Sequence, residues 1–482
     1  MTKPRFILID NALTTMVGHY YEYDIALLAN IPTSKYDTLF FSNIDAPGEL
    51  RDLTIPFFQC GFWAPSQNRR PVVIHDAGPV ASSSPAHPVA RAPRLGKSWS
   101  RSIRARDEQI IGWVRKFDHR FGNYLPVRPL FVAKSLRRWL VRARTAHPPT
   151  LVGGTTNQVK LHAEDVALRD IFQADLQQLF QQYAVGPQDV LFFPNMNQST
   201  LAAVIELVTQ VGCEQLPHMK MLFRRNVFVG HPTAEQYLSD SYFVRAFASL
   251  FDCLMQYRDC DKLEFFTDTD RLKIEYEVFS PFEFKVLPIP FRHEFIRPKL
   301  SSSQPFRVIY LGNARREKGF QYLPALVESM RSRVKCGQVE FVFQAMPDQD
   351  AMILEALPGL EGRPGVTLIK SPLTDREYYE LLNSGDIVLL LYDPVEYYSR
   401  SSCIFVESVV SATPFITFDG SWMTQVMVPG TGEVVKDATE LPVALERMLD
   451  NYPQYQQSIS CARETWKDYH NPKRLAEILM GM

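Results

Sequence analysis

The chain has 482 residues, a formal net charge of −1, and 46% apolar and 22% charged residues. Such a length exceeds what one hydrophobic core of ordinary size requires, so we expect two domains and room for an insertion. The composition is close to the globular average and excludes a chain that is mostly disordered. A mixed α/β protein with two sizeable cores is therefore expected.

The cysteines and apolar runs bear on the location of the protein. Seven cysteines are spread along the chain without a C-x-x-C pair, and their odd number argues against a disulfide framework. The apolar run at 6–9 is too short for a signal-peptide core, and we find no run of about 18 apolar residues of the kind a membrane-spanning helix requires. We expect a cytoplasmic protein whose membrane association, if any, is peripheral.

Short buried strands alternate with helical segments through the first 290 residues or so, which predicts a parallel sheet covered by helices. The clearest helices are expected at 163–183, where apolar residues keep one face, and at 199–211, after Asn195. The expected strands span 6–9, 38–41, 55–58, 190–193, 219–223, 263–266 and 286–289.

A basic stretch interrupts this alternation. Residues 66–150 hold 17 Lys and Arg against 4 Asp and Glu, a net charge of +13, which leaves −14 for the rest of the chain. Residues 79–100 are rich in Pro, Ser and Ala, which predicts a loop. Helical segments are expected at 107–121 and 130–144, the second amphipathic, with Trp139 on its apolar side. We interpret the stretch as an insertion in the first domain.

The alternation restarts after a predicted linker at 298–305. The expected strands span 307–311, 339–343, 366–369, 387–392 and 415–418, and the expected helices span 320–332, 348–356, 375–383, 404–411 and 440–450. This pattern predicts a second doubly wound domain. We place the domains at 1–297, including the insertion, and at 306–460, followed by a tail helix at 461–482. Ligands of such sheets bind outside the carboxyl ends of the strands.

Two of these strand ends carry residues suited to phosphate. After the strand ending at Leu311 come Gly312 and Asn313, and then Arg315-Arg316-Glu317-Lys318-Gly319 opens a helix. Glycine lets the backbone approach a diphosphate, a helix start offers free N–H groups, and cationic side chains neutralise the anion. After the strand ending at Tyr392, Ser401 and Ser402 precede the helix that carries Glu407. For the first segment the alternative is an ordinary solvated helix start. For the second it is an N-cap pair, with Glu407 on a solvated helix face.

In order and spacing, these segments resemble the donor-binding half of retaining glycosyltransferases of family 4. The resemblance implies the GT-B architecture, two facing Rossmann-like domains, with Lys318 on the donor diphosphate and Glu407 on the ribose hydroxyls. Two positions depart from the family pattern. Asn313 stands in place of the usual Arg, where Arg315 or Arg316 are the candidate substitutes, and Ser399 stands in place of the first loop glutamate, where Glu396 is a candidate. A weaker match is Gly18-His19 after the first strand, at the family's Gly-rich turn; His19 has a structural role as its alternative.

The resemblance implies transfer of a sugar from a nucleotide-diphosphate sugar to an acceptor, with retention and without a metal or other cofactor. We assign donor binding to Gly18, His19, Asn313, Arg316, Lys318, Ser401, Ser402 and Glu407, and assign no catalytic residue. Arg224 and Arg225, after a first-domain strand, are candidates for contact with a glycan or lipid-linked acceptor; plain surface charges are the alternative.

Other functions are also compatible with the sequence. The basic stretch, with the amphipathic segment 130–144, predicts docking on an anionic membrane surface, at the inner face of the membrane. The alternative is that the apolar face of this segment packs on the first domain and its arginines are solvated. The alternatives are a catalytically degenerate scaffold, which Ser399 and Asn313 favour, a polyanion-binding protein and a nucleotide-sugar epimerase. Nucleic acid is not expected as a partner, because the basic stretch lacks an aromatic stacking pattern. The absence of a G-x-x-x-x-G-K-[ST] or G-x-G-x-x-G motif leaves a P-loop nucleotidase or a standard dinucleotide enzyme without support.

Overall fold

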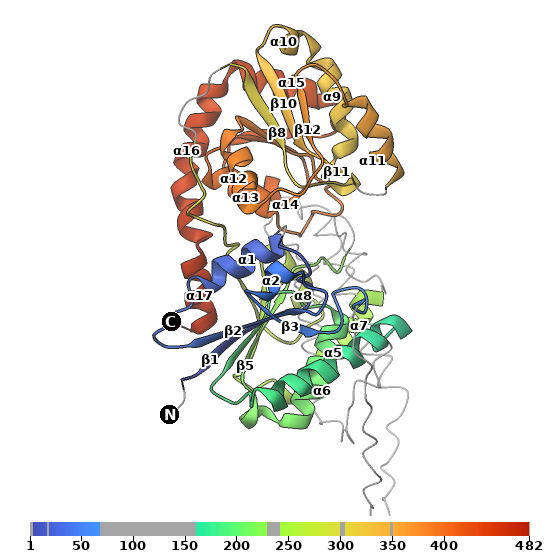
Figure 1. Ribbon diagram of the computed structural model, residues 1–482, viewed down its shortest axis with the longest axis vertical. Coiled ribbons are helices and arrows are strands. Elements are labelled where there is room, and N and C mark those ends of the chain that lie inside the picture. The colour runs from blue at the N-terminus through green and yellow to red at the C-terminus, as the bar shows by residue number, and fades with distance from the viewer. Residues whose placement is uncertain are drawn as a thin grey trace, which may run out of the picture. The chain divides into compact units, whose positions relative to one another are not determined.

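A computed structural model describes residues 3–16, 19–67, 161–228, 242–298, 304–347 and 350–481. Two parallel sheets flanked by helices organise them (Figure 1). The predicted linker 298–305 lies partly outside these residues, and the predicted basic insertion lies almost wholly outside them, as do both of its expected helices.

The first sheet has seven parallel strands in the order β3-β2-β1-β4-β5-β6-β7. Their alternating side chains divide the apolar residues between two cores: Ile7 and Ile9 face one side, and Phe6 and Leu8 face the other. The strands are β1 (Arg5–Asp10), β2 (Asp37–Asn43), β3 (Ile55–Phe58), β4 (Val190–Phe193), β5 (His218–Phe223), β6 (Leu263–Thr267) and β7 (Phe284–Val286). The sequence places the last of these strands two to three residues too late.

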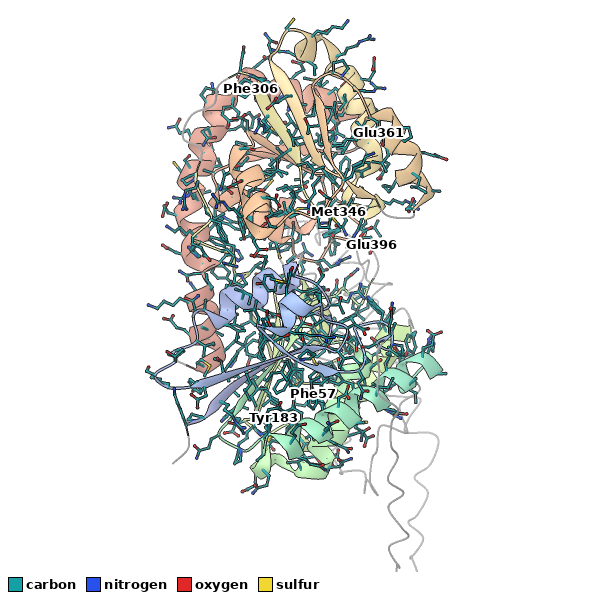
Figure 2. The ribbon with its side chains drawn as sticks, in the orientation of Figure 1. Phe57, Tyr183, Phe306, Met346, Glu361 and Glu396 are labelled. Carbon is teal, nitrogen blue, oxygen red and sulfur yellow. A yellow bond between two sulfur atoms is a disulfide. The ribbon has the colours of Figure 1, made fainter. Side chains whose placement is uncertain are left out.

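Helices cover both faces of this sheet. Their bounds are α1 (His19–Leu28), α2 (Gly48–Arg51), α5 (Ala163–Gln182), α6 (Gln198–Val211), α7 (Tyr242–Leu254) and α8 (Asp270–Glu277). The apolar faces of α5, α6 and α7 pack on the Ile7 side, where Phe57 and Tyr183 have ring centroids 6.2 Å apart (Figure 2). The side chains of α1 pack on the opposite side. Asn197 begins α6 with a capping box, its side chain accepting from the Thr200 N–H at 2.8 Å.

The second sheet has six parallel strands in the order β12-β10-β8-β13-β14-β15, the arrangement of a Rossmann fold. Its strands are β8 (Phe306–Tyr310), β10 (Val339–Gln344), β12 (Val366–Ile369), β13 (Ile387–Leu390), β14 (Phe415–Phe418) and β15 (Gly432–Val435), and a separate pair joins β9 (Asn313–Ala314) to β11 (Met346–Pro347). The α-helices of this half are α9 (Leu323–Ser329), α10 (Arg331–Lys335), α11 (Ala351–Ala356), α12 (Asp375–Ser384), α13 (Cys403–Val410), α14 (Trp422–Val426) and α15 (Leu441–Asp450).

The C-terminal segment forms two helices where the sequence suggested a single tail helix from 461. Helix α16 (Tyr452–Tyr469) packs beside α13. It ends at His470, whose Nδ1 accepts a hydrogen bond from the Ile289 N–H at 3.0 Å. The next helix, α17 (Pro472–Met480), returns to the first half, where Leu475 and Leu479 pack in the same core as Phe6 and Leu8. Strand β1 and helix α17, near the two ends of the chain, therefore share one core on the first sheet.

One pair of cysteines forms a disulfide, although the odd number of cysteines argued against a disulfide framework. Cys213, just after α6, and Cys260, just before β6, are joined by a disulfide with Cα atoms 5.9 Å apart. The odd total of seven allows one pair and five free thiols, so counting cysteines did not exclude it.

Candidate donor and acceptor site

Each sheet has a point where its strand order reverses direction, and ligands of such sheets bind there. In the second half this point lies between β8 and β13, which are hydrogen-bonded neighbours. The loops that leave these two strands carry Gly312 to Lys318 and Ser399 to Ser402. The fold therefore brings together the two segments that the sequence singled out for phosphate binding.

Glycine is required twice in the first of these loops. Gly312 has φ +96°, and a Cβ there would lie 2.7 Å from the Lys318 Nζ, so the lysine side chain reaches back over the glycine. Gly319 has φ +78°, and a Cβ there would lie 2.2 Å from the Leu391 carbonyl oxygen. The two glycines allow the loop to press against the end of β13 and place the ammonium group beside bare backbone.

Lys318 is a buried cation. Its side chain is 8% exposed, and its Nζ lies 5.6 Å from the centroid of the Tyr392 ring. Burial, with a contribution from Arg315, lowers the pKa of Lys318 to about 8. Within the described part of the chain, no hydrogen bond or ion pair reaches this ammonium. A buried charge without a hydrogen bond or ion pair is unfavourable, and an anionic ligand at this point would stabilise it.

Helix α13 begins beside this loop. The Ser402 Oγ caps the helix by accepting from the Phe405 N–H at 3.1 Å. The Ser401 Oγ donates to Asp268 Oδ2 at 2.6 Å. The N-cap interpretation is thus correct for Ser402, and both hydroxyls are engaged within the protein. The N–H groups of the first helical turn remain the anion-binding feature of this helix, because they lack intrahelical acceptors.

Glu407 is buried and not on a solvated helix face, as one interpretation of the sequence had it. It is 3% exposed and accepts hydrogen bonds from the Tyr378 hydroxyl at 2.5 Å and the Tyr379 hydroxyl at 3.1 Å. Burial raises the pKa of Glu407, whereas the two tyrosine hydroxyls and the charge of Lys318 lower it. Each carboxylate oxygen has a second lone pair with which it can accept from another hydroxyl.

The structure supports the remaining predicted donor-binding residues less directly than it does Lys318 and Glu407. Gly18 lies outside the described residues, and His19 begins α1 with a side chain that is not described. Asn313 is half-buried in β9, and Arg316 is exposed in the short 3₁₀ turn that ends at Lys318. Of the suggested substitutes, Arg315 pairs with Glu317 at 3.5 Å and Glu396 pairs with Arg400 at 3.9 Å.

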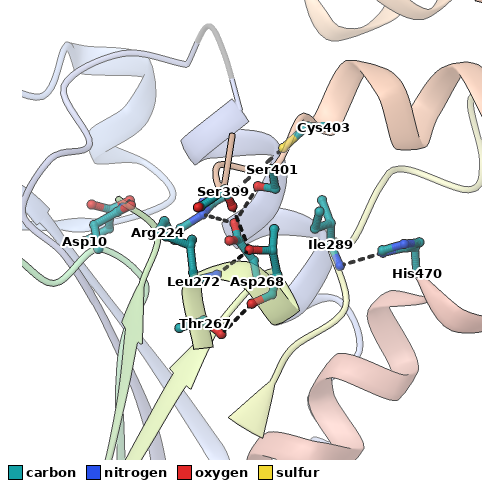
Figure 3. Close-up of polar contacts among 12 residues, drawn as sticks. Asp10, Arg224, Thr267, Asp268, Leu272, Ile289, Ser399, Ser401, Cys403 and His470 are labelled. Carbon is teal, nitrogen blue, oxygen red and sulfur yellow. Dashed lines mark hydrogen bonds and ion pairs between the residues drawn. The ribbon is translucent and has the colours of Figure 1, made fainter. Parts of the chain in front are cut away.

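Arg224, which follows β5, lies at the centre of a polar cluster that includes residues of both halves (Figure 3). Its Nε donates to Asp268 Oδ2 at 3.1 Å and its Nη2 to the Cys403 Sγ at 3.7 Å, while its guanidinium lies 4.8 Å from the Tyr23 ring centroid. Burial alone would lower the pKa of Arg224, but the nearby acidic groups, Asp268 first, keep it raised. The cluster ties the end of β6 to the first residues of α13.

Arg225 has different surroundings. Its guanidinium lies 3.9 Å from the ring centroid of Trp63 and 5.2 Å from that of Phe62, and the Trp63 side chain is 59% exposed. Burial and the proximity of Arg400 lower the pKa of Arg225. An exposed aromatic face beside arginines is suited to a sugar ring and its polar substituents.

Two buried carboxyl groups, Asp10 at the end of β1 and Asp24 in α1, were not predicted from the sequence as site residues. They are 1% and 0% exposed, and the amide of Asn195 donates to Asp10 at 3.1 Å. Burial raises the pKa of both acids, and that of Asp24 lies well above its ordinary value. The signal available in the sequence was the position of Asp10 directly after a buried strand.

The described residues contain no candidate metal site and no candidate membrane span. Their His, Cys, Asp and Glu side chains form no group of three or more that could hold a metal ion. None of the helices that the structure describes combines the length and apolar character needed to cross a membrane.

Comparison with known proteins relates the chain to others by fold. No protein-family model and no curated protein sequence matches it. Among solved structures, the N-terminal domain of Candida albicans trehalose-6-phosphate phosphatase superposes with a TM-score of 0.55 at 12% identity. An OtsA apo structure gives 0.54 at 11%, and an Escherichia coli structure titled trehalose-6-phosphate, bound with UDP-2-fluoro glucose, gives 0.53 at 11%. Each alignment covers 99% of this chain and 98% of the other. The chain has the GT-B fold of two Rossmann-like halves, as the sequence predicted.

Proposed function

We propose that this protein is a glycosyltransferase that transfers a sugar from a nucleotide-diphosphate sugar to an acceptor, and that the donor binds between the ends of β8 and β13. The observation that carries the proposal is Lys318, a buried ammonium that has no hydrogen bond or ion pair with any described residue, held against Gly312 at the switch point of the second sheet. A diphosphate supplies the missing negative charge.

The residues of the second half divide the work of donor binding. Lys318, Arg316 and the first-turn N–H groups of α13 stabilise the diphosphate, on which negative charge grows as the sugar departs. Ser401 and Ser402 hold the start of α13 in place, and Asn313 lies on the loop between Gly312 and Lys318. Glu407 accepts from the ribose hydroxyls with its remaining lone pairs. Gly18 and His19 are proposed to approach the donor from the first half. No metal or other cofactor has a role in this scheme, and retention at the anomeric carbon follows from the family resemblance.

The acceptor is proposed to bind on the first half, near Arg225 and Trp63. A sugar ring stacks on the exposed indole, and Arg225 donates to its oxygens. We further propose that this acceptor is lipid-linked and that residues 66–150, with their charge of +13, dock the protein on the anionic inner face of a membrane. This part of the proposal rests on the sequence alone.

Binding of nucleotide sugars to the wild-type protein tests the proposal. The donor to try first is UDP-glucose, because one neighbour by fold was solved with UDP-2-fluoro glucose; GDP-mannose, ADP-glucose and the free diphosphates complete the panel. Titration calorimetry and thermal shift should show one of them binding and stabilising the protein. If none binds, the donor site is wrong. If one binds but is neither hydrolysed nor transferred to any acceptor, the catalytically degenerate scaffold is the better description, since Ser399 already replaces a family glutamate.

A further inference from the structure

The segment that leads into α13 is held by one short helix of the first half. Five residues of the segment, Tyr398 to Ser402, precede the helix start. The Thr269 hydroxyl donates to the Ser399 carbonyl oxygen at 2.7 Å while it caps α8 by accepting from the Leu272 N–H at 3.0 Å. Asp268, one residue earlier, accepts from Ser401 at 2.6 Å. The segment is thus tied at two points to the start of α8 (Figure 3).

Two further contacts come from within α8. The Arg271 guanidinium donates to the Tyr398 hydroxyl and lies 4.8 Å from the Tyr398 ring centroid, and its Nε donates to Gln425 Oε1 at 2.6 Å. One turn further along, the Glu275 carboxylate accepts a hydrogen bond from the Ser399 Oγ. Side chains at these spacings lie on the same side of a helix.

Glu275 is the most deeply placed of these contacts. Both Glu275 and Ser399 are 0% exposed. The second carboxylate oxygen of Glu275 accepts from the Val227 N–H at 3.0 Å, and the Phe228 N–H also donates to this carboxylate. Three donors from two other segments therefore converge on one acid, which fixes its orientation. A buried carboxylate with this many donors is specific to its position, because an apolar side chain would leave the donors unsatisfied.

We propose that Glu275 is a positioning residue of the donor site: from the first half, it fixes Ser399 and thereby the segment in which Ser401 and Ser402 hold the first turn of α13 in place for the diphosphate. The inference rests on the proposed function for the identity of the ligand. It assigns a role in donor binding to a residue 132 positions away from Glu407 along the chain. It also gives Ser399 a role in the site, as the hydrogen-bond partner of Glu275.

Three variants test this assignment: Glu275→Gln, Ser399→Ala and the double variant. The contacts of Asp268, Thr269, Arg271 and Glu275 with residues 398–402 are called the clamp. The matched control is Glu283→Gln, at an exposed glutamate outside the clamp. The wild type is first titrated with UDP-glucose, GDP-mannose and ADP-glucose to find the nucleotide sugar that it binds. Each single variant should bind that nucleotide sugar about fivefold more weakly than the wild type does. The double variant should be no weaker than the worse single variant, because both changes break the same contact. Ser399→Ala removes one oxygen atom only, so it tests the proposal even if Glu275→Gln does not fold.

Hydrogen exchange provides a readout that needs no ligand. The peptide covering Tyr398 to Phe405 should exchange faster in both single variants, while peptides of α6 and the Glu283→Gln control remain as in wild type. Unchanged exchange in this peptide, unchanged affinity, or additive losses in the double variant would each overturn the inference. If exchange rises as expected but the wild type binds no nucleotide sugar, the proposed function is wrong, and so is the role of Glu275 in donor binding. The hydrogen exchange would then still support the clamp as a structural feature.

Discussion

The Nζ of Lys318 lies 2.7 Å from the place that a Cβ on Gly312 would occupy. These two residues are six positions apart and meet because the loop between them folds back at the end of β8. The pairing is specific: the lysine needs the room that only a glycine leaves, and the φ of +96° at Gly312 is one that L side chains rarely adopt.

Gly312→Ala is expected to weaken donor binding by displacing Lys318. The lysine end is flexible and can move, so the loss should appear mainly in nucleotide-sugar affinity, at roughly tenfold, with a smaller loss of stability of about 1–2 kcal/mol from the strained φ. Calorimetry and urea unfolding on the same preparation separate the two effects. A variant that is destabilised yet binds as tightly as wild type would show that donor binding does not depend on the position of Lys318 against Gly312.

Gly319→Ala is expected to be more damaging to the fold, because its Cβ would meet rigid backbone, 2.2 Å from the Leu391 carbonyl oxygen. The control is Gly337→Ala: Gly337 also has positive φ, +66°, but has nothing within 4 Å of the added Cβ. Both changes carry the conformational strain, so the difference in unfolding free energy isolates the clash. We expect the Gly319 variant to be less stable by more than about 2 kcal/mol. Equal losses would mean that the loop does not press against β13.

Lys318 should also impose a pH dependence on donor binding. Its pKa is lowered to about 8 in the free protein, and an anionic diphosphate favours the protonated form. Affinity should therefore be constant below about pH 7 and fall as the pH rises through about 8. UDP-glucose is a suitable probe, because both of its phosphates are fully ionised over this range. Lys318→Met should abolish the decline, and a decline that persists in this variant would assign it to another group.

Membrane docking predicts a salt-dependent affinity for anionic vesicles. Arg137→Glu/Arg138→Glu/Arg142→Glu should reduce cosedimentation with such vesicles at low salt, where charges are least screened. The control reverses three exposed cations of the folded halves, Arg331, Arg376 and Lys473, and changes the net charge equally. If both triple variants lose binding alike, the effect is one of net charge. If the wild type ignores anionic vesicles at low salt, the docking proposal fails, and equal binding to RNA would make the stretch a general polyanion surface.

The sequence was most informative where a local pattern decides the structure. The buried strands of both sheets were predictable because runs such as Phe6 to Ile9 alternate between two apolar cores. The loop with Gly312, Lys318 and Gly319 could be singled out from the sequence because glycines and cationic residues follow a strand end there; its role in donor binding stays a prediction. Long-range pairings were not: nothing near Glu275, Asp24 or Cys213 in the sequence indicates that they meet Ser399, Asp10 and Cys260. Glu407 shows the same limit, since its burial depends on Tyr378 and Tyr379 of another helix.

The return of α17 to the first sheet is a second case of this kind. Its amphipathic pattern identifies a helix, but not the core formed by Phe6 and Leu8 in which Leu475 and Leu479 are buried.

The donor site itself is tested most directly by calorimetric titration of three variants, Lys318→Met, Glu407→Gln and the control Lys335→Met, with the nucleotide sugar that the wild type binds. Lys335 is an exposed lysine at the end of α10, so its loss should leave affinity unchanged. The account predicts at least about tenfold weaker binding, roughly 1.4 kcal/mol, for both site variants in folded protein. Unchanged affinity in folded Lys318→Met would contradict it, because Lys318 is the buried cation that the account places on the diphosphate.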